Sequence, residues 1–233
     1  MDGTRRRLAA VTVGCAILVA ALGALFAGQS TADAFDRAAD APVISLFAGH
    51  GGLALWLAFP GTTIPAVVLS AVIAVACLLT GRIRGALLAI AAVPIAVGLC
   101  EVLIKPLVHR TYIGQVVYPS GHTATVFALA ATITVLLLAS PRPAMARPAM
   151  TRPAMTRPAM ARPLRVLILA VAYLAAVAVV VGVIAVRFHY FSDTVAGAAV
   201  GTGTACGLAL VLDVVQPRSV GARWMAPVAK RAR

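Results

Sequence analysis

Residues 166–186 read VLILAVAYLAAVAVVVGVIAV, a run without a single charged side chain. A bilayer span needs about 20 mostly apolar residues, so this run has the length and composition of one transmembrane helix. Arg165 and Arg187 flank it, as basic residues often do at the ends of a span. The whole chain of 233 residues is 61% hydrophobic and 12% charged, whereas a soluble domain has roughly 25% charged residues. The composition argues against a soluble globular protein.

Other apolar runs predict further spans of the same kind. The stretch 42–59 is broken by glycines within 49–52, so we interpret it as interfacial or re-entrant, with a seventh span as the alternative. The predicted fold class is all-α: a polytopic membrane protein of about six transmembrane helices in one bundle, with residues 1–233 forming a single membrane-embedded domain. The spans are expected near residues 8–28, 62–80, 85–104, 123–138, 166–186 and 194–215.

The formal net charge of +13 would suggest nucleic acid as a partner of a soluble protein, but here the basic residues lie between apolar runs. Lys and Arg concentrate in the cytoplasmic loops of membrane proteins. With both termini cytoplasmic, most of the 20 Lys and Arg fall on that side. We therefore predict an integral protein of the plasma membrane with no nucleic-acid partner. Four basic residues are left on the extracytoplasmic side: Arg37, Lys105, Arg110 and Arg187. A site for an anion would explain the last three.

Two basic segments and the first apolar run need separate interpretations. Residues 141–163 form a low-complexity Arg-Pro loop, read as a linker with a topology signal or as a basic patch against anionic lipid. Residues 216–233 form a basic cytoplasmic tail. The run 8–28 exceeds the usual length of a signal-peptide core, so we expect it to be retained. Asp213 is expected to pair with a nearby basic residue or to snorkel.

The first candidate site segment is 105–123, KPLVHRTYIGQVVYPSGHT. Ser120 beside Gly121 at a predicted helix start offers a hydroxyl and unpaired backbone N–H groups, an arrangement suited to phosphate. Lys105 and Arg110 would supply countercharge. The alternatives are that Ser120-Gly121-His122 is only a helix cap and that Lys105 forms an i,i+4 ion pair with Glu101.

The second candidate segment is 187–193, RFHYFSD, between the last two spans. His189 and Asp193 are four residues apart, so on a helix they share a face. Asp193 can hold one ring nitrogen of His189 and leave the other free, with the imidazole itself as nucleophile. The alternatives are a structural His–Asp hydrogen bond and an interface-anchor role for Arg187.

The order of these motifs resembles the type 2 phosphatidic acid phosphatase superfamily over residues 105–193. Its Pro-Ser-Gly-His block is intact at 119–122, and its His-x-x-x-Asp at 189–193. The resemblance implies a phosphohistidine mechanism that needs no metal or other cofactor. It implies that His189 attacks phosphorus, that Asp193 orients His189 and that His122 protonates the leaving oxygen. The phosphoryl oxygens would be held by Lys105, Ser120 and the Gly121 amide.

This sequence departs from the family pattern at two places. The family's Arg-Pro is replaced by Tyr112-Ile113, and its Ser-Arg by Gly182-Val183. Two phosphate-binding arginines are therefore missing from their usual positions. Arg110 and Arg187 lie nearby in the sequence and are the candidates to replace them.

We therefore predict a metal-independent lipid phosphate phosphatase with its active site on the extracytoplasmic face. Phosphatidate, phosphatidylglycerol phosphate and polyprenyl phosphates all fit, because the candidate residues lie where a lipid headgroup sits. A lipid-phosphate transporter or flippase that uses the same polar cluster is the alternative from another class. A metal site on His122, His189 and Asp193 is a third reading. The sequence leaves the choice of lipid and the oligomeric state open.

Overall fold

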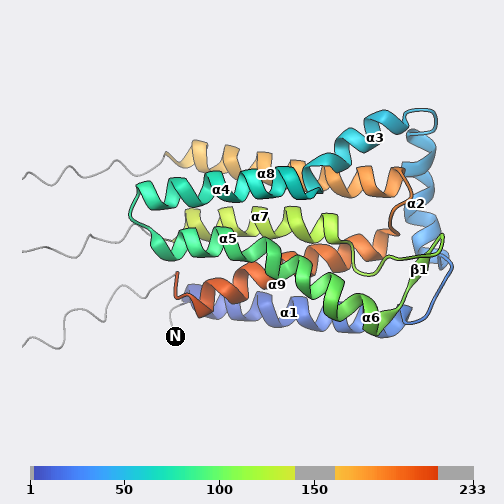
Figure 1. The fold of residues 1–233 in the computed structure, drawn as a ribbon, viewed down its shortest axis with the longest axis horizontal. Coiled ribbons are helices and arrows are strands. Elements are labelled where there is room, and N and C mark those ends of the chain that lie inside the picture. The colour runs from blue at the N-terminus through green and yellow to red at the C-terminus, as the bar shows by residue number, and fades with distance from the viewer. Residues whose placement is uncertain (1–2, 140–160, 215–233) are drawn as a thin grey trace, which may run out of the picture.

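The computed structural model describes residues 3–139 and 161–214, and it is built almost entirely of α-helices. Long apolar helices lie side by side and form one bundle (Figure 1). Within the described residues, five helical segments are long and apolar enough to cross a membrane, and α4 is an apolar helix of 17 residues, at the short end of the usual range. This confirms the all-α, polytopic prediction. The bundle helices are α1 (Gly3–Phe26), α4 (Thr63–Leu79), α5 (Ile83–Gly98), α7 (Gly121–Leu138), α8 (Arg162–Ala185) and α9 (Phe191–Val211).

Two further helices follow α1, and the first of them covers one end of the bundle. Helix α2 (Ala34–Leu46) lies across the bundle axis, and α3 (Gly51–Ala58) follows it after a bend (Figure 1). A 3-10 turn, η1 (Phe59–Gly61), then leads into α4, and the angle between α2 and the α3–η1 segment is 117°. The chain therefore breaks at the glycines of 49–52, as the sequence predicts, and this stretch is not one straight span.

The helical path of the chain continues beyond the end of α5. A π-helical segment, η2 (Leu99–Ile104), and a short helix, α6 (Lys105–Val108), continue it, and His109 with φ of 48° ends the helix in the left-handed region. Strands β1 (Thr111–Tyr112) and β2 (Gln115–Val116) then pair as a small antiparallel hairpin before α7. Because π-helical turns often accompany functional sites, the position of η2 directly before Lys105 is informative.

The close packing of α7 on α9 determines where the site forms. A Cβ on Gly197 would lie 2.4 Å from the Ser120 carbonyl oxygen, and one on Gly201 would lie 2.2 Å from that of Ala124. Only glycine at these two positions lets the backbones approach so closely. The amide of Ser120 then donates to the Asp193 carbonyl at 3.0 Å, which links the N-terminal ends of the two helices.

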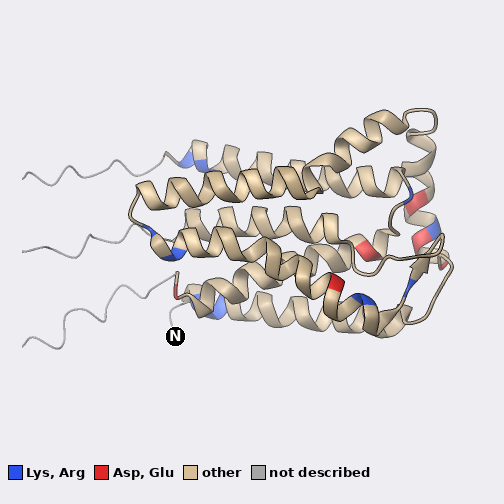
Figure 2. Ribbon diagram, viewed as in Figure 1, with Lys and Arg blue, Asp and Glu red and all other residues tan. Residues whose placement is uncertain are grey.

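The two ends of the bundle differ in their charged groups (Figure 2). The start of α1, the α4–α5 turn and the end of α9 share one end, where Asp213 pairs with Arg5 and, at 3.4 Å, with Arg84. The predicted pairing of Asp213 with a basic residue is thus confirmed. The connections α6–α7 and α8–α9 share the opposite end (Figure 1). Nearly all of the Arg-Pro loop and the whole basic tail lie outside the described residues.

Candidate active site

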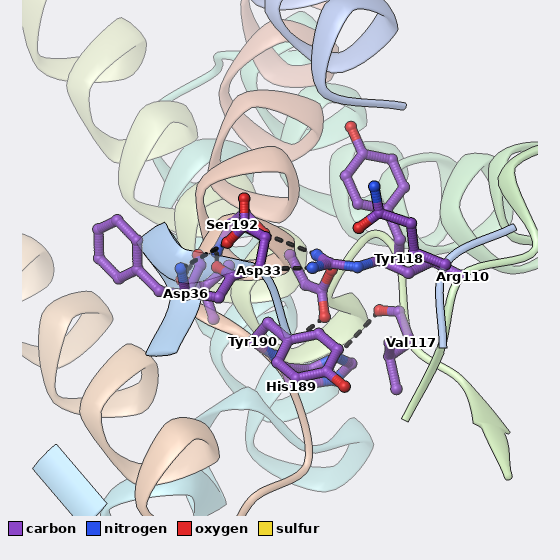
Figure 3. Close-up of polar contacts among 12 residues, drawn as sticks. Asp33, Asp36, Arg110, Val117, Tyr118, His189, Tyr190 and Ser192 are labelled. Atoms are coloured by element: carbon purple, nitrogen blue, oxygen red, sulfur yellow. Dashed lines mark hydrogen bonds and ion pairs between the residues drawn. The ribbon is translucent and has the colours of Figure 1, made fainter. Parts of the chain in front are cut away.

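His189 lies in the short connection between α8 and α9, at the end of the bundle that α2 covers (Figure 3). The chain turns sharply just before it, with Arg187 at φ of 57°. The His189 side chain is buried, and its Nδ1 atom lies 3.0 Å from the carbonyl oxygen of Val117. A carbonyl oxygen can only accept, so Nδ1 carries the hydrogen and Nε2 of the neutral ring keeps its lone pair. This is the tautomer that a nucleophilic histidine needs.

Burial also keeps the His189 ring uncharged. Burial, with smaller effects of the neighbouring His122 and Lys105, lowers the pKa of His189 from its ordinary value to about 3, although the Val117 carbonyl acts in the opposite direction. At physiological pH the folded protein therefore holds His189 neutral.

His122 faces His189 from the first turn of α7. The centroids of the two rings are 6.3 Å apart, and the His122 ring also lies 6.2 Å from that of Phe188. His122 is partly exposed. The two predicted catalytic histidines thus come together from different segments of the chain.

Lys105 and Glu101 form an ion pair beside the start of α7. Lys105 Nζ lies 2.7 Å from Glu101 Oε1 and 2.8 Å from Oε2, which confirms the predicted i,i+4 pair. A Cβ placed on Gly121 would lie 3.1 Å from the same Oε1. The carboxylate of Glu101 therefore lies against the first residue of α7, where the backbone N–H groups lack intrahelical partners.

Ser120 is the N-cap of α7, as one of the two readings predicts. Its Oγ accepts from the amide of Thr123 at 3.4 Å, and its side chain is buried. Gly121 follows and is partly exposed. A phosphate-binding role for these two residues stays a prediction.

The structure corrects the expectation that Asp193 orients His189 directly. Asp193 Oδ1 accepts from Arg110 at 2.7 Å, and Oδ2 accepts from the Tyr190 amide at 3.0 Å. The Nδ1 atom of His189 is instead held by the Val117 carbonyl. The reason is local, because Asp193 lies in the first turn of α9, caps the start of its own helix and is the counter-ion of a buried arginine.

Arg110 is the second correction. It was expected to bind phosphate, but its side chain is fully buried, and its two terminal nitrogens are taken by protein groups. One donates to Ser192 Oγ at 2.6 Å and to Asp193, and the other donates to Asp36 Oδ2 at 2.5 Å (Figure 3). The guanidinium is therefore committed to carboxylates within the fold. Arg187, in contrast, has an exposed side chain two residues before His189.

The packing explains why the family's two arginines are absent. A Cβ on Gly182 would lie 2.5 Å from the backbone nitrogen of Ala58, so α3 packs too closely on α8 for any larger residue. Val183 is fully buried next to it. In the other block, Tyr112 stacks on Tyr190 with ring centroids 4.4 Å apart. The packing thus leaves no room for an arginine at residue 183, and at residue 112 a tyrosine that contacts Tyr190 takes the place of the other arginine.

Sequence reasoning missed two contributors to this region. Asp36 is fully buried beside Arg110, and the Val117 carbonyl holds His189. A signal for Asp36 did exist, since α2 carries Asp36 and Asp40 on one helical face in a chain with only 7 acidic residues. No side-chain pattern identifies Val117, because its contribution is a backbone oxygen.

The described residues contain no group of three or more His, Cys, Asp or Glu side chains placed to hold a metal ion. The third reading, a metal held by His122, His189 and Asp193, has no support from this arrangement.

Comparison with known protein families gives one match. The model of the PAP2 superfamily matches residues 103–216, a segment that contains every predicted site residue. The match covers just under half of the chain, and this segment is similar to the PAP2 superfamily. The predicted resemblance to this family is thereby confirmed, and it supports phosphatase activity on a lipid-like phosphoester. No curated protein and no solved structure matches the chain. Asp36 and Glu101 lie before the segment that the PAP2 model matches.

Proposed function

We propose that this PAP2-superfamily protein hydrolyses the phosphoester or diphosphate of a membrane lipid through a phosphohistidine on His189. The observation that supports this most is the hydrogen bond from His189 Nδ1 to the Val117 carbonyl at 3.0 Å. It fixes the tautomer and leaves the Nε2 lone pair for attack.

The reaction needs two displacements at phosphorus. In the first, Nε2 of His189 forms a bond to phosphorus, the bond from phosphorus to the lipid oxygen breaks, and protonated His122 gives its proton to that oxygen. In the second, water attacks phosphorus, neutral His122 takes a proton from the water, and the P–N bond breaks to release inorganic phosphate. One acid–base group on the partner helix thus serves both steps, and the separation of 6.3 Å between the ring centroids leaves space for a phosphoryl group.

Positive charge and backbone amides hold the phosphoryl oxygens in this proposal. Lys105 supplies a cation beside the start of α7, and the Gly121 amide points from a helix N-terminus, where anions are favoured. Arg187 is exposed beside His189 and supplies the second cation. Ser120 Oγ keeps the first turn of α7 in place and contributes a hydroxyl.

The surroundings of the site favour a lipid over a soluble phosphate ester. Large apolar side chains are exposed on the segments that carry the site, and a lipid tail can contact them in the bilayer. The headgroup then meets the histidines at the end of the bundle. The basic residues at the opposite end support an extracytoplasmic site in the plasma membrane. The exposed apolar residues are Val102, Leu103, Leu107 and Phe188.

The test is phosphate release by the purified full chain in detergent micelles with excess chelator. Phosphatidate, phosphatidylglycerol phosphate and polyprenyl phosphate are offered in parallel. The wild type is expected to release phosphate from at least one of them, and His189→Ala is expected to release none. His50→Ala, at the exposed turn between α2 and α3, is the control and should match the wild type. If folded wild-type protein released no phosphate from any of the three lipids, the proposal would be contradicted and a lipid-phosphate transporter would be favoured.

A further inference from the structure

A buried network of charged groups surrounds the start of α9, and the proposed reaction does not use it. Arg110 contacts Asp36 of α2 and Asp193 of α9, and all three side chains are 0% exposed. Ser192 completes the network, since its amide donates to Asp36 Oδ1 and its hydroxyl to Oδ2, both at 2.9 Å. Two carboxylates thus surround one guanidinium, and the excess negative charge lies at a helix N-terminus, which favours it.

Two aromatic rings lie against the Arg110 guanidinium. Its central carbon lies 4.1 Å from the centroid of the Phe26 ring and 4.4 Å from that of Tyr190. Arg110 therefore joins α1, α2 and α9 at one point, and its planar group cannot turn toward substrate without leaving this stack.

Arg110 is connected to His189 through the backbone and through its side chain. Its carbonyl oxygen accepts from the Val117 amide at 2.9 Å, and the Val117 carbonyl in turn holds Nδ1 of His189. Its side chain holds Ser192 and Asp193, and Asp193 accepts from the amide of Tyr190, the residue after His189. The chain on both sides of the imidazole is thus fixed by one arginine (Figure 3).

Helix α2 supplies the counter-ion that keeps this arrangement in place. Asp36 binds Arg110 and Ser192, and Asp40, one turn later, accepts from the Phe191 amide at 3.1 Å. Both carboxylates meet the first turn of α9 from outside the segment that the PAP2 model matches.

We infer that Asp36 and Arg110 are positioning residues for His189, and that Arg110 does not bind the substrate phosphate. The inference rests on the proposed function, because it assigns the two residues to the orientation of the proposed nucleophile. Loss of Asp36 should release Arg110 from one side and loosen both connections to His189.

The test is steady-state kinetics of Asp36→Asn on the lipid that the wild type hydrolyses. Positioning predicts at least a tenfold fall in kcat with KM within about twofold of the wild type. Ser192→Ala removes single hydrogen bonds of the same network and should lower kcat by a smaller factor, which keeps the test informative if Asp36→Asn does not fold. Asp213→Asn breaks ion pairs at the opposite end of the bundle and should leave kcat unchanged.

Chemical modification gives a readout that does not require turnover. Diethyl pyrocarbonate reacts with exposed neutral imidazoles, and mass spectrometry measures the modification of His189 separately from that of His50. Asp36→Asn should raise the modification rate of His189 at least fivefold and leave that of His50 unchanged. An inactive wild type would contradict the proposed function, whereas this measurement would still test the inference.

Two results would overturn the inference. Unchanged kcat and unchanged His189 modification in folded Asp36→Asn would show that the network only stabilises the fold. A raised KM with unchanged kcat in folded Asp36→Asn would show that the network serves substrate binding rather than the position of His189.

Discussion

Nδ1 of His189 lies 3.0 Å from the carbonyl oxygen of Val117, and no carboxylate takes that position. A neutral acceptor fixes the ring tautomer without adding a negative charge beside the nucleophile. Burial can then hold the ring uncharged, since no anion stabilises the imidazolium at this nitrogen. The carboxylate expected there, Asp193, is bound to Arg110 instead.

The activity of the free enzyme should persist in acid. Burial lowers the pKa of His189 to about 3, so protonation of this residue should not reduce kcat/KM near its ordinary value of 6.5. The measurement is the pH profile of kcat/KM between pH 4 and 8. An acid limb of kcat/KM with an apparent pKa near 6.5 would contradict the burial argument. The same shift predicts that the free energy of unfolding falls as the pH drops below 6.5. Below that pH His189 binds a proton in the unfolded chain but stays neutral in the folded protein.

Replacement of Glu101 by Gln should strengthen phosphate binding. The Glu101 carboxylate accepts a hydrogen bond from Lys105 Nζ at 2.7 Å and lies against Gly121, where the phosphoryl group is proposed to bind. Removal of its charge should lower KM roughly three- to tenfold, which corresponds to about 0.7 to 1.4 kcal/mol. The check is KM together with the inhibition constant of inorganic phosphate. Glu101→Gln with a raised KM would mean that Glu101 orients Lys105 rather than competing with substrate.

Restoring the family's arginine at residue 183 should not create a phosphate ligand. Val183 is fully buried and lies beside Gly182, whose Cβ position is filled by the α3 backbone. Val183→Arg would bury an unpaired charge, so we expect loss of folded protein. Thermal unfolding in detergent measures this effect. A stable Val183→Arg with a lowered KM would refute the packing account.

Gly201 should be as important for activity as for folding. A Cβ there would lie 2.2 Å from the Ala124 carbonyl oxygen, so Gly201→Ala must push α9 away from α7. We expect a loss of about 1 to 3 kcal/mol in stability, together with lower kcat, because His122 and His189 are carried by the two separated segments. Gly14→Ala is the control, since a Cβ at Gly14 meets nothing within 4 Å. Equal kcat for Gly201→Ala and the wild type would contradict the link between helix packing and the site.

Arg187 should contribute to substrate binding but not to folding. Its side chain is exposed beside His189, so Arg187→Gln should raise KM several-fold and leave thermal unfolding unchanged. Arg37→Gln, on the exposed side of α2, is the matched control. An unchanged KM in Arg187→Gln would show that Arg187 does not bind substrate and would favour its role as an anchor at the membrane interface.

The sequence predicts the bundle well because apolar length and charge asymmetry are local properties. The interruption at 49–52, the helix start at Ser120 and the pairing of Lys105 with Glu101 follow from neighbouring residues, and all three appear in the structure. The order of the motifs also predicts that His122 and His189 share one site, and the separation of their rings supports this.

The sequence did not predict the partners of Arg110 and Asp193 because these depend on tertiary placement. The counter-ion Asp36 lies 74 residues before Arg110, and nothing in the sequence shows that α2 folds across the end of the bundle. The Val117 carbonyl is a backbone group, so its contact with His189 is visible only in three dimensions.

The most direct test of the central claim is to trap the covalent intermediate. The full chain is mixed with lipid phosphate carrying radioactive phosphorus, quenched in base within milliseconds, and digested for mass spectrometry. The account predicts a base-stable, acid-labile phosphoryl group on His189, present in the wild type and in His50→Ala and absent in His189→Ala. Phosphate release without any labelled protein, or a label on another residue, would contradict it.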